Sequence, residues 1–159
     1  NLWEYVEKNT EASRQEIMSA SNLAGRAIGI TSTTAPHAMC YKITTTYGFP
    51  HGHSVAICLP RVWKYMLSPP EKVTDKRGAD YLFEIFENIA RSLGYDSAES
   101  AADGFEKMLE KLEIGYPDEC DKESRAHEFA DSVNVERLGN NPVALDNDAL
   151  YHLYLEMFV

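Results

Sequence analysis

The sequence predicts an all-α fold, a helical bundle, and three observations support that prediction. Apolar residues recur at helical spacing along most of the chain, as at Tyr81, Leu82, Ile85, Phe86 and Ile89. No segment of useful length alternates apolar and polar residues with the period of two that a half-buried strand requires. With 159 residues and 44% hydrophobic composition, the chain is long enough to bury a core of its own. We expect roughly six or seven helices from these periodicities.

Two helices are predicted in the first third of the chain. Helical spacing of apolar residues indicates one over residues 11–28, and the hydroxyl-rich run 31–34 breaks it. Pro36 suits the first turn of the next, which should run to about residue 44. This second helix carries His37 and is nearly uncharged apart from Lys42, which is typical of a helix in the centre of a bundle.

A third helix should begin at His51, after a turn marked by Gly48 and Pro50. Its apolar pattern continues to about residue 66, with Pro60 inside it. A proline removes one backbone hydrogen bond and clashes with the preceding turn, so we expect Pro60 to kink this helix or divide it. Residues 67–72 then read as a loop.

Four more helices complete the prediction. One covers residues 81–93 and ends at Gly94. Asp96 or Ser97 should cap the next, which Gly115 and Pro117 close. Two shorter helices, over residues 122–134 and 146–157, flank a turn at residues 139–142.

Charge and cysteine content restrict the partners and the compartment. The net charge of −10 leaves no basic stripe for a nucleic-acid backbone, and no apolar run approaches the length of a membrane helix. We therefore expect neither a nucleic acid nor a membrane as partner. Cys40, Cys58 and Cys120 are odd in number and form no Cys-x-x-Cys pair, which favours a reducing, cytoplasmic setting. Cys40 and Cys58 should be buried in the core.

Two histidines are the most informative residues of the chain. His37 and His51 lie fourteen positions apart, one on a predicted helix and one after the following turn. The helix end lies about 10 Å beyond His37, and six extended residues reach up to about 20 Å, so the chain can bring His51 back to His37. Imidazole is the commonest neutral nitrogen ligand of divalent metals. The spacing can therefore build half of a metal site, although histidines that only satisfy core hydrogen bonds are more common.

The surrounding residues 19–66 resemble the iron-containing alcohol dehydrogenase family, above all in Ala-Pro-His-Ala-Met at 35–39 and Gly-Phe-Pro-His-Gly at 48–52. In that family the corresponding histidines are two of four metal ligands, which implies the same role for His37 and His51. The sequence around His37 is similar to that of the branch that includes phosphonoacetaldehyde reductases. The other two ligands, an Asp and a His one helical turn apart, would precede Asn1, because no Asp-x-x-x-His occurs before His37.

The resemblance also implies what the chain is part of. Residues 1–159 would form a single helical, metal-binding domain of a two-domain enzyme, whose N-terminal dinucleotide-binding domain lies outside this sequence, since no Gly-x-Gly-x-x-Gly motif occurs in it. The full-length enzyme would be an NAD(P)-dependent alcohol dehydrogenase or aldehyde reductase acting on small alcohols or aldehydes, and we expect a homo-oligomer. Fe²⁺, replaceable by Zn²⁺, would act as a Lewis acid. The isolated chain should be inactive.

Four further residues are candidates for the site. Tyr41 is one helical turn after His37, where many family members have a second histidine, and its phenol could bind the substrate oxygen as a catalytic group or simply lie in the core. Arg137 and Lys42 are candidates for an anionic substrate group, since a guanidinium matches a phosphonate or carboxylate. Arg137 could instead serve only as a helix-end arginine. His53 should support His51 or an interface rather than bind metal.

Two alternatives remain open at this stage. Zinc-dependent glycerol-dehydrogenase-like and dehydroquinate-synthase-like enzymes share the two-domain plan and the helical histidines. In the other alternative, the chain is a non-enzymatic helical interaction module in which both histidines are structural.

Overall fold

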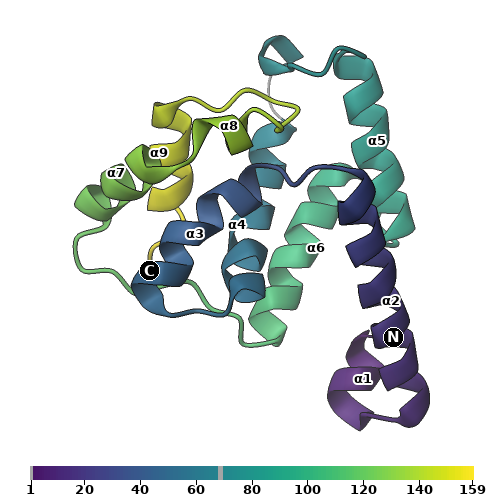
Figure 1. Cartoon of the computed structure of the whole chain (residues 1–159). Coiled ribbons are helices and arrows are strands. Elements are labelled where there is room, and N and C mark those ends of the chain that lie inside the picture. Colours follow the sequence, from purple (N-terminus) through teal and green to yellow (C-terminus); the bar gives the residue numbers. More distant parts are fainter. Residues whose placement is uncertain (1, 68–69) are drawn as a thin grey trace. The chain divides into compact units, whose positions relative to one another are not determined.

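The computed structural model describes residues 2–67 and 70–159, and within them it confirms the all-α prediction (Figure 1). The described residues form nine α-helices and one 3₁₀ helix, more than expected because α1 and α8 are short. Their only β-type pairing is an isolated bridge between Val73 and Val143. The chain divides into two compact units, Asn1–Thr33 and Thr34–Val159, which are described separately. That residues 1–159 act as one domain stays a prediction.

The first unit consists of α1 (Leu2–Lys8) and α2 (Glu11–Ile30), which contact each other. The turn between them passes through Asn9, whose φ of 47° lies in the left-handed region that asparagine tolerates. Thr10 then caps α2, because its hydroxyl accepts a hydrogen bond from the Ser13 amide at 3.1 Å. The predicted helix over residues 11–28 is confirmed and extends two residues further.

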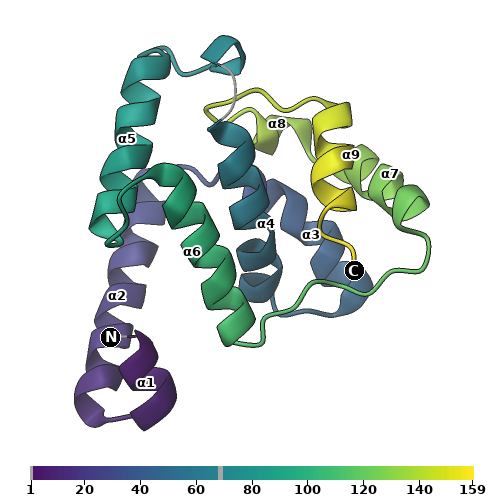
Figure 2. The ribbon, with the colours of Figure 1, turned by 180° about the vertical axis from the view of Figure 1, so that it is seen from behind.

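The second unit is built around α3 (Ala35–Tyr47) and α4 (His51–Met66), which lie side by side. Gly48 adopts a φ of 69° and ends α3, so that only three residues separate the helices. α4 lies between α3 and α6, as Figure 2 shows from behind. A division of α4 at Pro60 is not observed: the helix continues to Met66. Pro60 is buried with Ile57 and Val62, and this packing holds the helix across the missing hydrogen bond.

α5 (Ala79–Ser92) and α6 (Ala98–Lys111) pack against each other beside α4. Ser97, rather than Asp96, caps α6: its hydroxyl accepts from the Ser100 amide at 3.1 Å, and the Ser100 hydroxyl accepts from the Ser97 amide. The loop predicted over residues 67–72 falls partly on residues 68–69, which lie outside the described residues. Its end, Pro70–Lys72, is the 3₁₀ helix.

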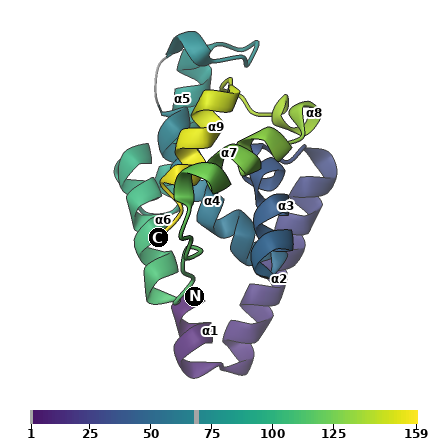
Figure 3. The same cartoon turned by 90° about the vertical axis from the view of Figure 1, so that its left-hand side faces the viewer.

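The C-terminal part contributes α7 (Lys122–Ser132), α8 (Val135–Leu138) and α9 (Asn147–Leu155), with α7 against α9 (Figure 3). The core that joins these helices to α3 and α4 is aromatic. Phe129 meets Tyr154 edge-on with ring centroids 5.4 Å apart, and both are fully buried. The Tyr154 hydroxyl donates to the Met39 carbonyl at 2.8 Å, which fixes α9 to α3.

Candidate functional site

His37 and His51 face each other, as their spacing predicts. His37 lies in the first turn of α3, and His51 is the first residue of α4. Their ring centroids are 5.6 Å apart, and the ring planes are inclined by 58°. The tight turn after Gly48 produces this approach, because it returns the chain to the helix that carries His37.

The separation fits two imidazoles on one metal ion. A ring nitrogen binds Fe²⁺ or Zn²⁺ at about 2.1 Å, which places each ring centroid about 3 Å from the ion. Two such rings at a near-tetrahedral angle have centroids about 5 Å apart, close to the observed distance. Within the described residues, however, no group of three or more His, Cys, Asp or Glu side chains is placed to hold a metal. The histidine pair by itself could supply two ligands to a metal ion, and further ligands would have to come from elsewhere.

The surroundings of His37 favour the neutral form of its ring and hold its helix turn in place. Partial burial, with a smaller effect of the neighbouring His51, lowers the pKa of His37. Buried Asn141 accepts a hydrogen bond from the Ala35 amide at 3.3 Å and donates to the Val143 carbonyl at 2.7 Å. It thereby holds the start of α3 to the segment after α8. From the sequence, Asn141 is expected only as part of a turn. The neighbouring residues carry no sign that its side-chain amide contacts a helix 106 residues earlier.

His51 contacts a cysteine that sequence reasoning placed only in the core. Cys40 is fully buried on α3, and its Sγ lies 3.6 Å from Nδ1 of His51. The same sulfur donates to the His37 carbonyl at 3.2 Å. Burial raises the pKa of Cys40 to about 11, so the group is a thiol at neutral pH.

Tyr41 and Arg137 meet beside the histidines. The Tyr41 ring lies 5.8 Å from the His51 ring, centroid to centroid. The Arg137 guanidinium lies over the face of Tyr41, with its carbon 4.7 Å from the ring centroid, and donates a hydrogen bond to the phenolic oxygen. Both side chains are exposed. Tyr41 therefore does not act as a core tyrosine.

A small cavity of about 260 Å³ adjoins this pair. Its lining comes from α3, the end of α7 and α8, and it includes three of the predicted site residues. The lining residues are Ala38, Tyr41, Lys42, Ser132, Asn134 and Arg137. Within the described residues, Arg137 forms no ion pair with a carboxylate, so its charge is available to a ligand in this cavity. Lys42 differs, because its ammonium pairs with Glu128 at 2.9 Å.

His53 points elsewhere. Its Nε2 donates to the Gly115 carbonyl at 2.7 Å, and its ring stacks on Phe49 with centroids 4.3 Å apart. These contacts hold the segment after α6 against the start of α4. A supporting role of His53 toward His51 stays a prediction.

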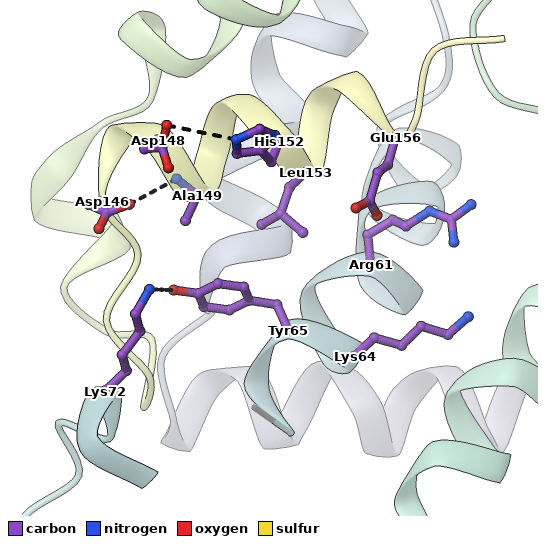
Figure 4. A pocket seen from close by; sticks show the side chains of 10 residues that line it. All are labelled: Arg61, Lys64, Tyr65, Lys72, Asp146, Asp148, Ala149, His152, Leu153 and Glu156. Atoms are coloured by element: carbon purple, nitrogen blue, oxygen red, sulfur yellow. Dashed lines mark hydrogen bonds and ion pairs between the residues drawn. The ribbon is translucent and has the colours of Figure 1, made fainter. Parts of the chain in front are cut away.

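A larger cavity of about 420 Å³ lies between α4 and α9, away from the predicted site residues (Figure 4). Arg61 and Lys64 on its α4 side are paired with Glu106, at 2.7 and 2.8 Å. Lys72 donates to the Tyr65 hydroxyl at 3.2 Å, and His152 lies 3.8 Å from Asp148 on α9. Two of its cations already face a carboxylate, and three further carboxylates, those of Asp146, Asp148 and Glu156, line it, so this cavity offers a weaker anion site than the one at Arg137.

None of the described helices combines the length and the apolar character needed to cross a membrane.

Comparisons with known proteins show the family of the chain. The chain matches the C-terminal part of the Fe-containing alcohol dehydrogenase family over residues 1–158. It is 29% identical to a phosphonoacetaldehyde reductase of Streptomyces viridochromogenes over 89% of this chain and 36% of that protein. A 1,3-propanediol dehydrogenase of Klebsiella pneumoniae is 32% identical over 65% of this chain and 25% of its own length.

A solved structure supports the same relationship. An iron-containing alcohol dehydrogenase from Thermococcus thioreducens matches with a TM-score of 0.60 and 26% identity, over 77% of this chain and 31% of that one. The chain thus spans about a third or less of the length of these relatives. The match over nearly every residue shows that this chain belongs to the Fe-containing alcohol dehydrogenase family.

Proposed function

We propose that this chain is the metal-binding, substrate-side domain of an NAD(P)-dependent alcohol dehydrogenase or aldehyde reductase. The observation that carries the proposal is the pair of imidazoles, 5.6 Å apart, at the start of two adjacent helices and beside the Tyr41–Arg137 cavity. The relatives named above are dehydrogenases and a reductase, which supports the same reaction class. No residue of this chain is assigned to the nicotinamide, which would bind on the N-terminal domain of the longer protein.

His37 and His51 would hold the metal together with ligands outside this chain. Fe²⁺, or Zn²⁺ in its place, supplies a Lewis acid for the alcohol or aldehyde oxygen when it is bound. The lowered pKa of His37 favours the neutral form of the ring, which is the form that binds metal. Tyr41, whose ring lies 5.8 Å from that of His51, would donate its phenolic hydrogen to the substrate oxygen as hydride transfer occurs.

Arg137 would bind an anionic group at the far end of the substrate. Its guanidinium is positioned by Tyr41, and two of its nitrogens remain for a phosphonate or carboxylate in the adjoining cavity. Lys42 lines the same cavity but shares its charge with Glu128, so we infer a secondary role for it. One of the relatives is named a phosphonoacetaldehyde reductase, and phosphonoacetaldehyde is an aldehyde with an anionic group. That name supports an anionic aldehyde as the substrate.

The cellular setting follows from the cysteines. Cys40, Cys58 and Cys120 are free, and the first two are buried. We infer a reducing compartment such as the cytoplasm. Assembly into a homo-oligomer stays a prediction.

The first experiment is a calorimetric titration of anaerobic Fe²⁺, and separately of Zn²⁺, into this chain and into His37→Ala and His51→Ala. Weak binding that either substitution abolishes would support a half-site. His127→Ala is the matched control, because His127 is an exposed histidine on α7 whose ring stacks on Tyr151 and contacts neither His37 nor His51 in the described structure. Metal binding that survives both substitutions would place the ligands elsewhere and remove the proposal.

A second experiment concerns the reaction. The isolated chain should show no NAD(P)H turnover, because it has two of the four expected ligands and no nucleotide domain. Turnover by these 159 residues alone would contradict that division of roles.

A further inference from the structure

Cys40 makes two contacts that together determine which nitrogen of His51 carries hydrogen. Its Sγ lies 3.2 Å from the His37 carbonyl oxygen and 3.6 Å from Nδ1 of His51. A thiol has one hydrogen to donate, and a carbonyl oxygen can only accept. The shorter contact is to the carbonyl, so the S–H hydrogen points there. The sulfur lone pairs are then left facing the imidazole.

We propose that Cys40 is a positioning residue that holds His51 in its Nδ1–H tautomer, so that Nε2 keeps a free lone pair for the metal. Nδ1–H donates to the sulfur, and the S–H donates onward to the backbone of the turn that carries His37. A single buried sulfur thus connects the two proposed ligands. Metal-bound histidines commonly donate their second ring nitrogen to a fixed acceptor, usually a carboxylate, a carbonyl or water. Here a thiol takes that place.

The location of Cys40 places this contact in the protein interior. Its side chain is fully buried, and it lies on α3 one helical turn after His37. His51 begins α4 and is exposed on its other side. The ring is therefore held at Nδ1, which leaves Nε2 for another partner. The tautomer of His51 is a property of the metal-free chain. Only the expected effect on metal affinity rests on the proposed function.

The test reads the tautomer directly. Long-range ¹H–¹⁵N correlation of ¹⁵N-histidine-labelled, metal-free chain, at a pH about two units above the ordinary histidine value of about 6.5, distinguishes Nδ1–H from Nε2–H. His51→Gln identifies the signal among the five histidines. We expect Nδ1–H at His51 in the unsubstituted chain and in Cys40→Ser, whose hydroxyl also bonds to the helix backbone and accepts from Nδ1. Cys40→Ala should change His51 to Nε2–H.

Cys58→Ala is the matched control, because it removes another fully buried cysteine sulfur, on α4, and should leave the His51 tautomer unchanged. Nε2–H at His51 in the unsubstituted chain would overturn the proposal, even if Cys40→Ala does not fold. An unchanged Nδ1–H tautomer in folded Cys40→Ala would overturn it as well.

The consequence is measured by Co²⁺ affinity in the full-length enzyme, where Cys40→Ala should weaken binding by about tenfold or more and Cys40→Ser should restore most of it. Equal Co²⁺ affinities in the unsubstituted and Cys40→Ala enzymes would contradict the positioning role. A full-length protein with His51 as Nδ1–H that binds no Co²⁺ at all would instead remove the proposed function and leave the tautomer assignment standing.

Discussion

Arg137 donates a hydrogen bond to the hydroxyl of Tyr41, across 96 residues of sequence, and lies over the ring of the same residue. The two side chains come from α8 and α3, and both line the cavity beside the histidine pair. Tyr41 thereby fixes an arginine that has no carboxylate partner within the described residues. The pair combines a candidate group for the reacting oxygen with a candidate group for a substrate anion.

Removing the arginine should discriminate between substrates. Arg137→Ala in the full-length enzyme should raise KM for phosphonoacetaldehyde by about tenfold or more, since a charge-assisted pair contributes about 1.5–3 kcal/mol, and should leave KM for acetaldehyde nearly unchanged. Steady-state kinetics on both aldehydes would measure this. Arg77→Ala is the control, because Arg77 is also stacked on a tyrosine, Tyr81, but outside the site. Equal increases for the two aldehydes would exclude an anion-binding role.

The tyrosine hydroxyl should matter to turnover. Tyr41→Phe keeps the ring under Arg137 but removes the proposed donor, so kcat should fall about tenfold, the effect of a hydrogen bond of ~1.4 kcal/mol in the transition state. Tyr41→His introduces the residue that many family members carry there and should retain most of kcat. Tyr81→Phe serves as the matched tyrosine with a stacked arginine. An unchanged kcat in Tyr41→Phe would make Tyr41 a support for Arg137 alone.

The bond from Tyr154 to Met39 should contribute measurably to stability. Tyr154 is fully buried, and its hydroxyl donates to the Met39 carbonyl at 2.8 Å. Tyr154→Phe should lower the free energy of unfolding by about 1 kcal/mol, because the hydrogen bond is lost while the ring packing remains. Urea unfolding of this chain would show it, with the exposed Tyr81→Phe as reference. A stability equal to that of the unsubstituted chain would mean that water replaces the lost donor.

The stability of the chain should also fall in acid through Glu119. Its carboxylate accepts from Arg125 at 2.8 Å and from the Tyr47 hydroxyl at 2.7 Å, and these bonds lower its pKa to about 2. The folded pKa lies below the unfolded value of about 4.3, so the contribution is complete above that pH and is lost as the pH falls toward 2.

Comparison of urea midpoints at about pH 7 and about pH 3 would test this linkage. Glu119→Gln should be less stable than the unsubstituted chain at neutral pH, and the difference should narrow in acid. Glu110→Gln changes an exposed residue on α6 and should have the same urea midpoint as the unsubstituted chain at both pH values. A constant difference for Glu119→Gln at the two pH values would show that its charge is not the cause.

The helices could be predicted from sequence because their signals are local. Periodicity and capping located α2 and α4 closely, and the Gly48 turn fixed the return of His51 to His37. Of the two outcomes expected at Pro60, a kink or a division of the helix, the division is not observed, and local sequence does not show how much packing surrounds a proline. The number of helices was underestimated, since α8 is only four residues long and has no measurable period.

The sequence could indicate that His37 and His51 lie together with Tyr41 and Arg137 nearby, but not the other partners of these side chains, and the roles of the four residues stay predictions. The contact of Cys40 with His51 depends on how α3 and α4 rotate about their axes, and spacing alone does not determine that rotation. The pairing of Lys42 with Glu128 depends on the packing of α7 against α3. The Gly115 carbonyl that receives His53 belongs to an irregular segment, for which sequence carries no periodic signal.

The two hydrogen bonds of Asn141 connect the start of α3 to a segment that is synthesised much later. The start of α3 obtains one of its partners from a residue 106 positions later, close to the C-terminus. Closing so long a loop is slow, and a chain emerging from the ribosome has α3 and α4 complete well before Asn141 is available. The start of α3 receives this support only after the later segment has docked, so we expect a chain truncated before Asn141 to keep both histidines in its sequence yet lack one of the contacts that fix the helix start.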